Sequence, residues 1–530
     1  MYMRLIPLFF ISVFACLHSG AQTGFQRSYG GNNADIAWAI CNTPAQGFAL
    51  AGYSSSLGSG GENFYLLKTD SAGNKSWGRL YGGNSRDELY ALQQTADAGY
   101  ILAGYERGLA GNSYCGMLVR VNSLGDTLWA KVYGGAKNNY ANSVQQTADG
   151  GFVLGGYSTS TIISGDSGNA YLVKTDATGN LQWAQVYGGP TQYTDIYSVV
   201  QTADKGYAFT GYTNSFGELN GDAFLAKTDS AGVLQFFKTY GNKGVDWGNS
   251  LQQTTDGGFI IGGTYSTDST SSDADLLMIK TDAAGDTVWT RSFGGSALDY
   301  GQSIVQKQDG GYAAAGYTNS FGHGNFDYYL VSCTSNGDTV FSRAFGGSGT
   351  EEANALVQTA GKGFALAGSS DSYGSGLDDL YLVRTDSNGN SSCNQYDIHA
   401  AKRTAVLYVN TVTAQQAVAI TVVSSFQSLQ DTGCMQTDPC QANGIASQTK
   451  SNLIKAYPNP TNGITRFSAD DLSGKCLIRI SDITGKIVYQ GLYQLPADLD
   501  LTQLSNGVYF AELSQNNASF RTRLIVGKDQ

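Results

Sequence analysis

Short apolar stretches alternate with short polar, glycine-rich stretches along most of the chain. In one representative unit the apolar stretches cover residues 142–147, 152–157, 170–175 and 181–186. Their β-branched and aromatic content predicts strands, and the Asp, Asn and Gly residues between them predict tight hairpin turns. Each unit is therefore expected to be a four-stranded antiparallel meander.

The unit returns at a nearly constant interval. Each copy begins with Tyr-Gly-Gly or a close variant, and successive copies are 52, 52, 54, 53, 53 and 52 residues apart. The seven copies begin at Tyr29, Tyr81, Tyr133, Tyr187, Tyr240, Phe293 and Phe345. A fixed period of this length indicates a repeat architecture.

The two ends of the array complement each other. A large aromatic residue lies four residues before each copy, but the seventh copy stops before the strand that would carry the next one. Phe25 lies four residues before the first copy and belongs to no complete unit. We therefore predict an all-β, seven-bladed β-propeller of four-stranded blades over residues 22–392, in which the N-terminal strand closes the last blade. An open solenoid is the alternative, but it would need polar capping repeats.

Composition narrows the possible partners. The chain has 69 Gly and only 7 Pro among 530 residues, so glycine here marks turns between strands. Its formal net charge is −11 and only 14% of its residues are charged. An acidic chain without a basic stripe is unsuited to nucleic acid and to anionic membrane surfaces.

Residues 1–21 have the pattern of a secretory signal peptide. Arg4 precedes an apolar run from Leu5 to Leu17, and small residues precede an expected cleavage between Ala21 and Gln22. A lipoprotein signal ending at a cysteine in the run is the alternative, but the residues before that cysteine fit a lipobox poorly. No other stretch is long and apolar enough for a transmembrane helix.

A recurring core has Asp-Gly-Gly followed by Phe or Tyr, three further residues and Gly, as at residues 149–156. This pattern resembles the Kelch, WD-repeat and, most closely, SBBP-type propellers of secreted bacterial proteins, over residues 22–390. The resemblance implies the propeller fold and no particular activity.

The C-terminal segment contains four motifs in order. They are AYPNPTNG (456–463), CLIRISDITGKIVYQ (476–490), LTQLSNGVYFAEL (501–513) and RTRLIVGKDQ (521–530). Residues 454–530 thus resemble the type A C-terminal sorting domain of the type IX (Por) secretion system of Bacteroidetes. The resemblance implies a small β-sandwich that directs export by that machinery. Its motif positions are Tyr457, Pro458, Asn459, Pro460, Gly463, Gly485, Gly507, Val508 and Tyr509.

Between array and sorting domain, residues 393–441 contain two β-rich runs and three cysteines, Cys393, Cys434 and Cys440. We expect a small β appendage with one disulfide, whose pairing the sequence leaves open. Residues 442–453 are polar and are expected to be a linker. The remaining cysteines of the mature chain are expected to be buried thiols.

No catalytic residue is predicted. The mature chain has only two histidines, His323 and His399, and neither lies in a recognisable catalytic motif. Asp70 and Trp77 lie in a turn that recurs with Asp, Gly and Trp, but the spacing differs from that of a sialidase Asp box. A hairpin turn explains these residues.

Acidic or amide residues recur at two positions of the unit. The first series is Asp35, Asp87, Asn139, Asp195, Asp246, Asp299 and Glu351, with Asp195 displaced by one residue. The second series is Asn63, Asn169, Asp222, Asp275, Asp327 and Asp379. A residue present in nearly every unit favours loop capping over binding of Ca²⁺ or sugar hydroxyls. The loop that most resembles a metal site contains Asp268, Asp273 and Asp275 and lacks the EF-hand pattern. The sequence predicts no cofactor, with Ca²⁺ as the alternative.

Residues that differ between units are better candidates for a ligand site. One position near the end of the first strand carries Trp38, Tyr90, Asn142, Tyr197, Asn249, Gln302 and Asn354. Aromatic and amide side chains around one mouth suit a carbohydrate or a protein loop. The predicted ligand-binding residues are Trp38, Tyr90, Tyr197, Trp247 and Tyr300. Packing between blades is the alternative for each of them.

The sequence therefore predicts a secreted or cell-surface protein that passes through the periplasm. Its propeller is expected to bind a polysaccharide or a protein partner without catalysis. The alternatives are a glycan hydrolase or lyase with carboxylates at the propeller mouth, and a structural surface protein.

Overall fold

The computed structural model describes residues 24–526 except 59–60, 83–85, 108–113, 135–136, 161–167, 190–191, 218–219, 268–272, 413–414, 419–427, 431–434, 438–453, 458–463, 470–473, 483–485 and 516–517. All regular elements of the described residues are strands, and the chain divides into two compact units at residue 441. The predicted signal peptide with Ala21 and Gln22, and the predicted linker 442–453, lie outside the described residues. No helix of the described part is long and apolar enough to cross a membrane.

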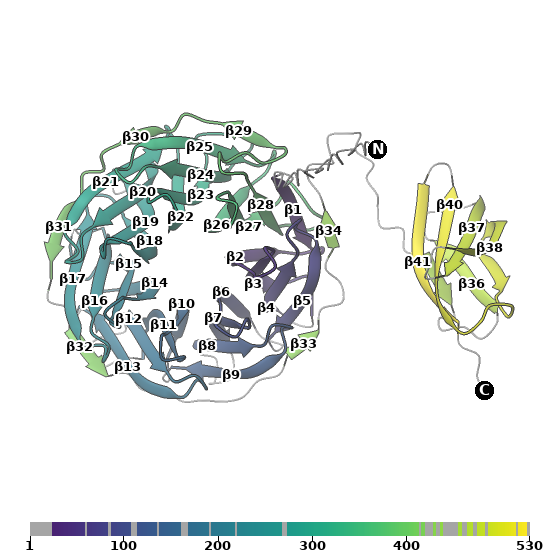
Figure 1. Ribbon diagram of the computed structural model, residues 1–530, viewed down its shortest axis with the longest axis horizontal. Coiled ribbons are helices and arrows are strands. Elements are labelled where there is room, and N and C mark those ends of the chain that lie inside the picture. Colours follow the sequence, from purple (N-terminus) through teal and green to yellow (C-terminus); the bar gives the residue numbers. More distant parts are fainter. Residues whose placement is uncertain are drawn as a thin grey trace, which may run out of the picture. The chain divides into compact units, whose positions relative to one another are not determined.

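The first unit contains seven antiparallel sheets around a common centre (Figure 1). The innermost strands of sheets 1 to 7 are β2 (Asp35–Asn42), β6 (Asp87–Gln94), β10 (Asn139–Gln146), β14 (Thr194–Gln201), β18 (Trp247–Gln253), β22 (Asp299–Gln306) and β26 (Glu351–Gln358). The second strands are β3 (Phe48–Ser54), β7 (Tyr100–Arg107), β11 (Phe152–Ser158), β15 (Tyr207–Thr213), β19 (Phe259–Ser266), β23 (Tyr312–Thr318) and β27 (Phe364–Ser370). The strands predicted for the representative unit therefore match those of sheet 3, except that β10 begins three residues earlier than predicted.

The outer half of each sheet follows the same order. The third strands are β4 (Asn63–Thr69), β8 (Tyr114–Val121), β12 (Asn169–Thr175), β16 (Asp222–Thr228), β20 (Ala274–Thr281), β24 (Asp327–Cys333) and β28 (Asp379–Arg384). The fourth strands of sheets 1 to 6 are β5 (Lys75–Tyr81), β9 (Thr127–Tyr133), β13 (Leu181–Gly188), β17 (Leu234–Gly241), β21 (Thr287–Gly294) and β25 (Thr339–Phe345). In sheet 7 the N-terminal strand β1 (Phe25–Gly30) takes this place and pairs with β28, Phe25 lying opposite Arg384.

Residues 393–441 were expected to form a separate small appendage, but their described strands extend the sheets of the array. They are β29 (Gln395–Asp397), β30 (Ala401–Arg403), β31 (Tyr408–Thr411), β32 (Gln415–Val418), β33 (Ser428–Gln430) and β34 (Met435–Thr437). They pair in turn with the outer strands of sheets 6, 5, 4, 3, 1 and 7, and we call them the belt (Figure 1). A fourth strand left at an edge exposes unpaired N–H and C=O groups, and the belt pairs with them.

Neighbouring sheets meet where an aromatic side chain of one fourth strand lies on a turn of the next sheet. Gly125 has φ of +84°, and a Cβ there would lie 2.9 Å from the Trp77 ring, so the turn needs glycine for both conformation and space. The contact recurs as Phe25–Gly73, Trp77–Gly125, Trp129–Gly179, Trp183–Gly232, Phe236–Gly285, Trp289–Gly337 and Phe341–Gly389.

The tyrosine of Tyr-Gly-Gly fixes the same turn. Tyr133 is fully buried and its hydroxyl donates to the carbonyl oxygen of Gly179 at 2.7 Å. Equivalent bonds join Tyr29 to Gly73, Tyr81 to Gly125, Tyr187 to Gly232 and Tyr240 to Gly285. The recurring tyrosine is thus explained by a buried carbonyl in the next sheet that needs a donor.

The innermost strands are also linked to one another. A serine hydroxyl in one strand accepts the backbone N–H of a residue in the next strand, at 3.1 or 3.2 Å. The pairs are Ser143–Val199, Ser198–Leu251, Ser250–Ile304 and Ser303–Leu356. These bonds hold neighbouring innermost strands in register and so set the positions of the side chains at the centre.

The second unit has two sheets that share one core. The first sheet has the strand order β35 (Ile454–Tyr457), β36 (Ile464–Ala469), β39 (Ala497–Asp500). The second sheet has the strand order β38 (Ile487–Leu495), β37 (Gly474–Asp482), β40 (Gly507–Gln515), β41 (Ala518–Val526). Phe467, Ile478 and Leu513 are fully buried between them. Of the motif positions, Tyr457 is the last residue of β35, and β40 begins with Gly507, Val508 and Tyr509. The Tyr509 hydroxyl donates to the carbonyl oxygen of Ser505 at 2.9 Å. Pro458, Asn459, Pro460, Gly463 and Gly485 lie outside the described residues.

We predict that Tyr133→Phe destabilises the array by about 1 to 2 kcal/mol, because it leaves the buried Gly179 carbonyl without its donor. The measurement is the midpoint of urea unfolding followed by near-UV circular dichroism. Tyr408→Phe is the matched control, since it removes a tyrosine hydroxyl from an exposed side chain of β31. An unchanged midpoint for Tyr133→Phe would show that the bond does not hold the sheets together.

We further predict that deletion of residues 22–29 lowers Tm, because it removes most of β1. This strand is both the fourth strand of sheet 7 and the partner of β34. Truncation at residue 450 serves as the control, since it removes only the second compact unit. The same Tm in the first deletion and the intact chain would refute the joining role of β1.

Candidate functional site

Each innermost strand carries one β-bulge at the same place. In β10 the pairing with β11 shifts between Ala141 and Ser143, so Asn142 is the extra residue. The other six innermost strands shift at the equivalent residue. A bulge re-aims the side chain of its extra residue. We call these extra residues the channel ring: Trp38, Tyr90, Asn142, Tyr197, Asn249, Gln302 and Asn354.

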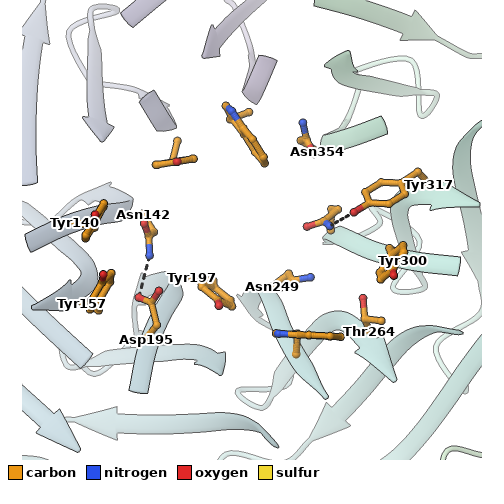
Figure 2. Close-up of a pocket in the computed structure, with 14 residues that line it drawn as sticks. Tyr140, Asn142, Tyr157, Asp195, Tyr197, Asn249, Thr264, Tyr300, Tyr317 and Asn354 are labelled. Carbon is orange, nitrogen blue, oxygen red and sulfur yellow. Dashed lines mark hydrogen bonds between the residues drawn. The ribbon is translucent and has the colours of Figure 1, made fainter. Parts of the chain in front are cut away.

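The channel ring lines a cavity of about 530 Å³ at the centre of the seven sheets (Figure 2). Four further lining residues lie two positions earlier in the same strands, and three lie opposite them in the second strands. They are Tyr140, Asp195, Trp247 and Tyr300, followed by Tyr157, Thr264 and Tyr317. All five predicted ligand-binding residues therefore lie on one cavity, and their role in binding stays a prediction.

Aromatic rings form a continuous arc on one side of this cavity. Successive ring centroids are 4.7–6.3 Å apart, and Tyr140 stacks on Tyr157 at 4.7 Å. The order is Trp38, Tyr90, Tyr105, Tyr140, Tyr157, Tyr193, Tyr212 and Trp247. Contacts of this geometry stabilise the orientation of each ring, so the arc is held in place before any ligand binds.

The opposite side carries amide side chains together with Tyr300 and Tyr317 (Figure 2). Asn249 Nδ2 donates to the carbonyl oxygen of Gly301 at 2.7 Å, and Asn354 Nδ2 donates to that of Ala37 at 3.0 Å. Each amide therefore links one innermost strand to the next. Such packing between sheets is the alternative to ligand binding given from the sequence. Each bond uses a single N–H, and an amide has a second N–H and an acceptor oxygen for other partners.

Asp195 lies in the cavity rather than in the loop-capping series to which its sequence position assigned it. Thr194 takes the capping position, with its backbone N–H bonded to Gly168 and its hydroxyl 2.9 Å from that of Thr213. The sequence did carry a sign of this difference. Asp195 lies one residue later than the other members of its series, and adjacent residues of a strand face opposite sides.

The Asp195 carboxylate is held by neutral donors. Its Oδ2 accepts the Tyr193 hydroxyl at 2.7 Å and its Oδ1 accepts Asn142 Nδ2 at 2.9 Å. The side chain is 4% exposed, and burial raises its pKa to about 7. Asp195 is the one carboxylate among the described residues that line the cavity.

Several other acidic residues of the two series cap loops, which agrees with the interpretation favoured from the sequence. Asp246 accepts the backbone N–H groups of Asn242 at 2.9 Å and Ser266 at 3.2 Å. Asp327 accepts that of His323 at 2.7 Å. These bonds satisfy loop N–H groups that have no partner in a strand.

Two of the three weak metal candidates, Asp273 and Asp275, lie within the described residues. Asp275 lies buried in β20, where it accepts the Ser292 hydroxyl and pairs with Arg403 of the belt, each at 2.8 Å. Asp273 is described and Asp268 is not. The described part of the chain contains no cluster of three or more His, Cys, Asp or Glu side chains that fits a metal ion.

None of the described cysteines and histidines lines the cavity. Cys41, Cys115, Cys333 and Cys476 are free thiols, three of them buried and Cys41 half-buried. The expected disulfide stays a prediction, since Cys434 and Cys440 lie outside the described residues. His323 stacks on Tyr396 at 4.6 Å between ring centroids.

Two capping carboxylates meet at several junctions between sheets. A Cβ on Gly346 would lie 2.0 Å from Asp327 Oδ1 and 2.3 Å from Glu351 Oε2, so only glycine fits between the two groups. Burial raises the pKa of Asp327 to about 7, and the nearby Glu351 adds to the effect. Burial likewise raises the pKa of Asp246 to about 7 and that of Asp379 to about 6.

These raised values predict a stability that falls as pH rises from about 4 to 7. In that window the folded chain binds more protons than the unfolded chain, so the free energy of unfolding decreases with pH. Below this window the trend reverses, because Asp204, whose pKa is lowered to about 2 by hydrogen bonds from Lys227 and Thr202, becomes protonated. Thermal unfolding from pH 3 to 8 should therefore give the highest Tm near pH 4, where the two trends meet.

Asp327→Asn should flatten the decline of Tm between pH 5 and 7. The variant is tolerable, because Asn63 and Asn169 occupy the equivalent position in two other sheets. A slope equal to that of the unaltered chain would contradict protonation of Asp327 in the folded state.

Comparisons with known proteins bear on export and on fold. Residues 455–527 match the family model of the secretion system C-terminal sorting domain. The second unit is therefore a type IX sorting domain, and the protein is exported to the cell surface or secreted, through the type IX machinery. No curated protein matches the chain in sequence.

Solved structures resemble the chain only distantly. Sqt1 from Chaetomium thermophilum is 12% identical, with 64% of this chain and 81% of that chain covered and a TM-score of 0.39. The extracellular domain of the hybrid two component system BT3049 from B. thetaiotaomicron is 8% identical, with coverage of 93% and 55% and a TM-score of 0.35. A eukaryotic initiation factor is 10% identical, with coverage of 73% and 98% and a TM-score of 0.33. No inference about function follows from similarities of this size.

Proposed function

We propose that this exported protein is a non-enzymatic binding module, and that its central cavity binds a polysaccharide. The observation that carries the proposal is the aromatic arc facing a row of amides across one cavity. Sugar rings stack their apolar C–H faces on aromatic side chains, while their hydroxyls pair with amides and carboxylates. A cavity of about 530 Å³ is within the usual size of small-ligand sites.

The proposal includes a closed, seven-bladed β-propeller as the scaffold. Closure is supported by β1, which joins the two ends of the array in sheet 7. It is further supported by the aromatic–glycine contacts, which run from each sheet to the next, Phe341–Gly389 and Phe25–Gly73 being those on the two sides of sheet 7. A closed ring would keep the innermost strands, and so the cavity, at fixed positions.

The enzymatic alternative is less well supported. Glycoside hydrolysis ordinarily uses two carboxyl groups, roughly 5 to 9.5 Å apart, one on each side of the scissile bond. The described lining supplies Asp195 as its single carboxylate. Binding of a protein loop in the same cavity remains the alternative among binding roles, and a structural role without a ligand is a third possibility.

The test is a glycan array probed with the mature chain, with and without Ca²⁺, followed by titration calorimetry on any ligand found. We expect binding of specific glycans. Trp38→Ala and Trp247→Ala should each weaken Kd at least about tenfold, or about 1.4 kcal/mol, because each removes a stacking surface of the cavity.

Tyr408→Ala is the matched control, because Tyr408 is an aromatic residue on β31 that is 55% exposed and does not line the cavity. Equal Tm values would show that the cavity variants remain folded. Binding that survives both tryptophan changes would place the site elsewhere. Cleavage of an arrayed glycan would favour the enzymatic alternative, and an array without any binding would refute the proposal.

A further inference from the structure

The cavity has an uneven distribution of charge. Asp195 is the one residue with an ordinarily charged side chain among those lining it, and no Lys or Arg belongs to the described lining. Two more acidic residues, Glu88 and Glu352, occupy the position of Asp195 in β6 and β26, two residues before the channel ring. Glu88 pairs with Arg86 at 2.5 Å and accepts the Tyr90 hydroxyl at 2.6 Å. The centre therefore favours a cationic group over an anionic one.

Two other buried charged groups of the array have an ionic partner: Asp275 pairs with Arg403, and Lys174 pairs with Asp149, each at 2.8 Å. Asp195 instead accepts hydrogen bonds from neutral donors, the Tyr193 hydroxyl, the Asn142 amide and the Ile196 backbone N–H. No charged side chain among the described residues is paired with it. Buried carboxylates are stabilised most by a cationic partner that also donates a hydrogen bond.

The surroundings of Asp195 suit an ammonium group. The titratable side chains that face it are Tyr157, Tyr193, Tyr197 and Tyr212, and burial raises the pKa of each, so all four are neutral. Two of these, Tyr157 and Tyr197, line the cavity themselves. A cation near aromatic faces gains attraction from their π electrons in addition to the ion pair.

We propose that Asp195 makes the cavity selective for a glycan that carries an unacetylated amino sugar, whose ammonium group pairs with the Asp195 carboxylate. The inference rests on the proposed binding of a polysaccharide and names the sugar that the site prefers. In this arrangement Asn142 and Tyr193 position the carboxylate, and the aromatic arc provides the stacking surface for the sugar ring. An N-acetyl group would remove the positive charge and keep the rest of the sugar.

The experiment compares two probes of equal length: the β-1,4-linked glucosamine tetramer and its fully N-acetylated form. Titration of the mature chain at pH 6.5 should give a Kd for the free-amine tetramer at least about tenfold lower, or about 1.4 kcal/mol. Asp195→Asn should reduce this ratio to about one, because the amide cannot form the ion pair. Asp327→Asn is the matched control, since it changes a buried carboxyl that lies outside the cavity, and should keep the ratio.

The pH dependence of the unaltered chain gives a second measurement if Asp195→Asn does not fold. The pair needs an ionised carboxylate and a protonated amine, so the preference for the free-amine tetramer should pass through a maximum and fall at both lower and higher pH. Binding of the N-acetylated tetramer should lack this maximum.

The outcomes separate the two proposals. Equal affinity for both tetramers, preference for the N-acetylated form, or a preference retained in Asp195→Asn would overturn the role of Asp195 while glycan binding itself stands. If neither tetramer nor any arrayed glycan binds, the proposed function fails and this inference fails with it.

Discussion

The structure depends on how each sheet is placed against the next. One contact does this at every junction: an aromatic ring of a fourth strand lies on a turn glycine of the following sheet. At five junctions a buried tyrosine hydroxyl also holds the carbonyl of that glycine. The turn can accept no side chain, so its distance from the ring is fixed by direct contact. These contacts therefore hold the bulged innermost strands around one centre, where their extra residues line the cavity.

The sequence predicted the repeating part of this arrangement well, because each unit carries its own local signals. Alternating apolar stretches, Asp-Gly turns and the tyrosine recur often enough for one unit to support the interpretation of another. The channel ring was also identifiable, since Trp38, Tyr90 and Asn142 occupy one position of the repeat and differ from unit to unit. The convergence of these residues on a single cavity could not be predicted, because it depends on a β-bulge in each innermost strand. A bulge leaves no signature in composition.

The belt and Asp195 show where sequence reasoning fails. The strands of the belt are three or four residues long, and their partners lie between 50 residues (Phe345–Gln395) and 409 residues (Ser28–Thr437) earlier, so neither length nor alternation reveals them. Asp195 was grouped with capping residues because it is acidic and nearly in register. A displacement of one residue moves a side chain to the other face of a strand, and that single step separates a loop cap from the cavity.

The belt also determines how the array would respond to force. Both β1 and β34 lie in sheet 7, adjacent and antiparallel, with Ser28 opposite Thr437. A load applied between the start of β1 and the end of β34 opens this pair one hydrogen bond at a time, the mechanically weak direction of a sheet. Once the expected disulfide of Cys393 is reduced, the belt peels from one outer strand after another, and residues 395–437 release roughly 140 Å of chain at about 3.3 Å per residue. The belt would thus act as a strain absorber that yields before the inner strands carry any tension.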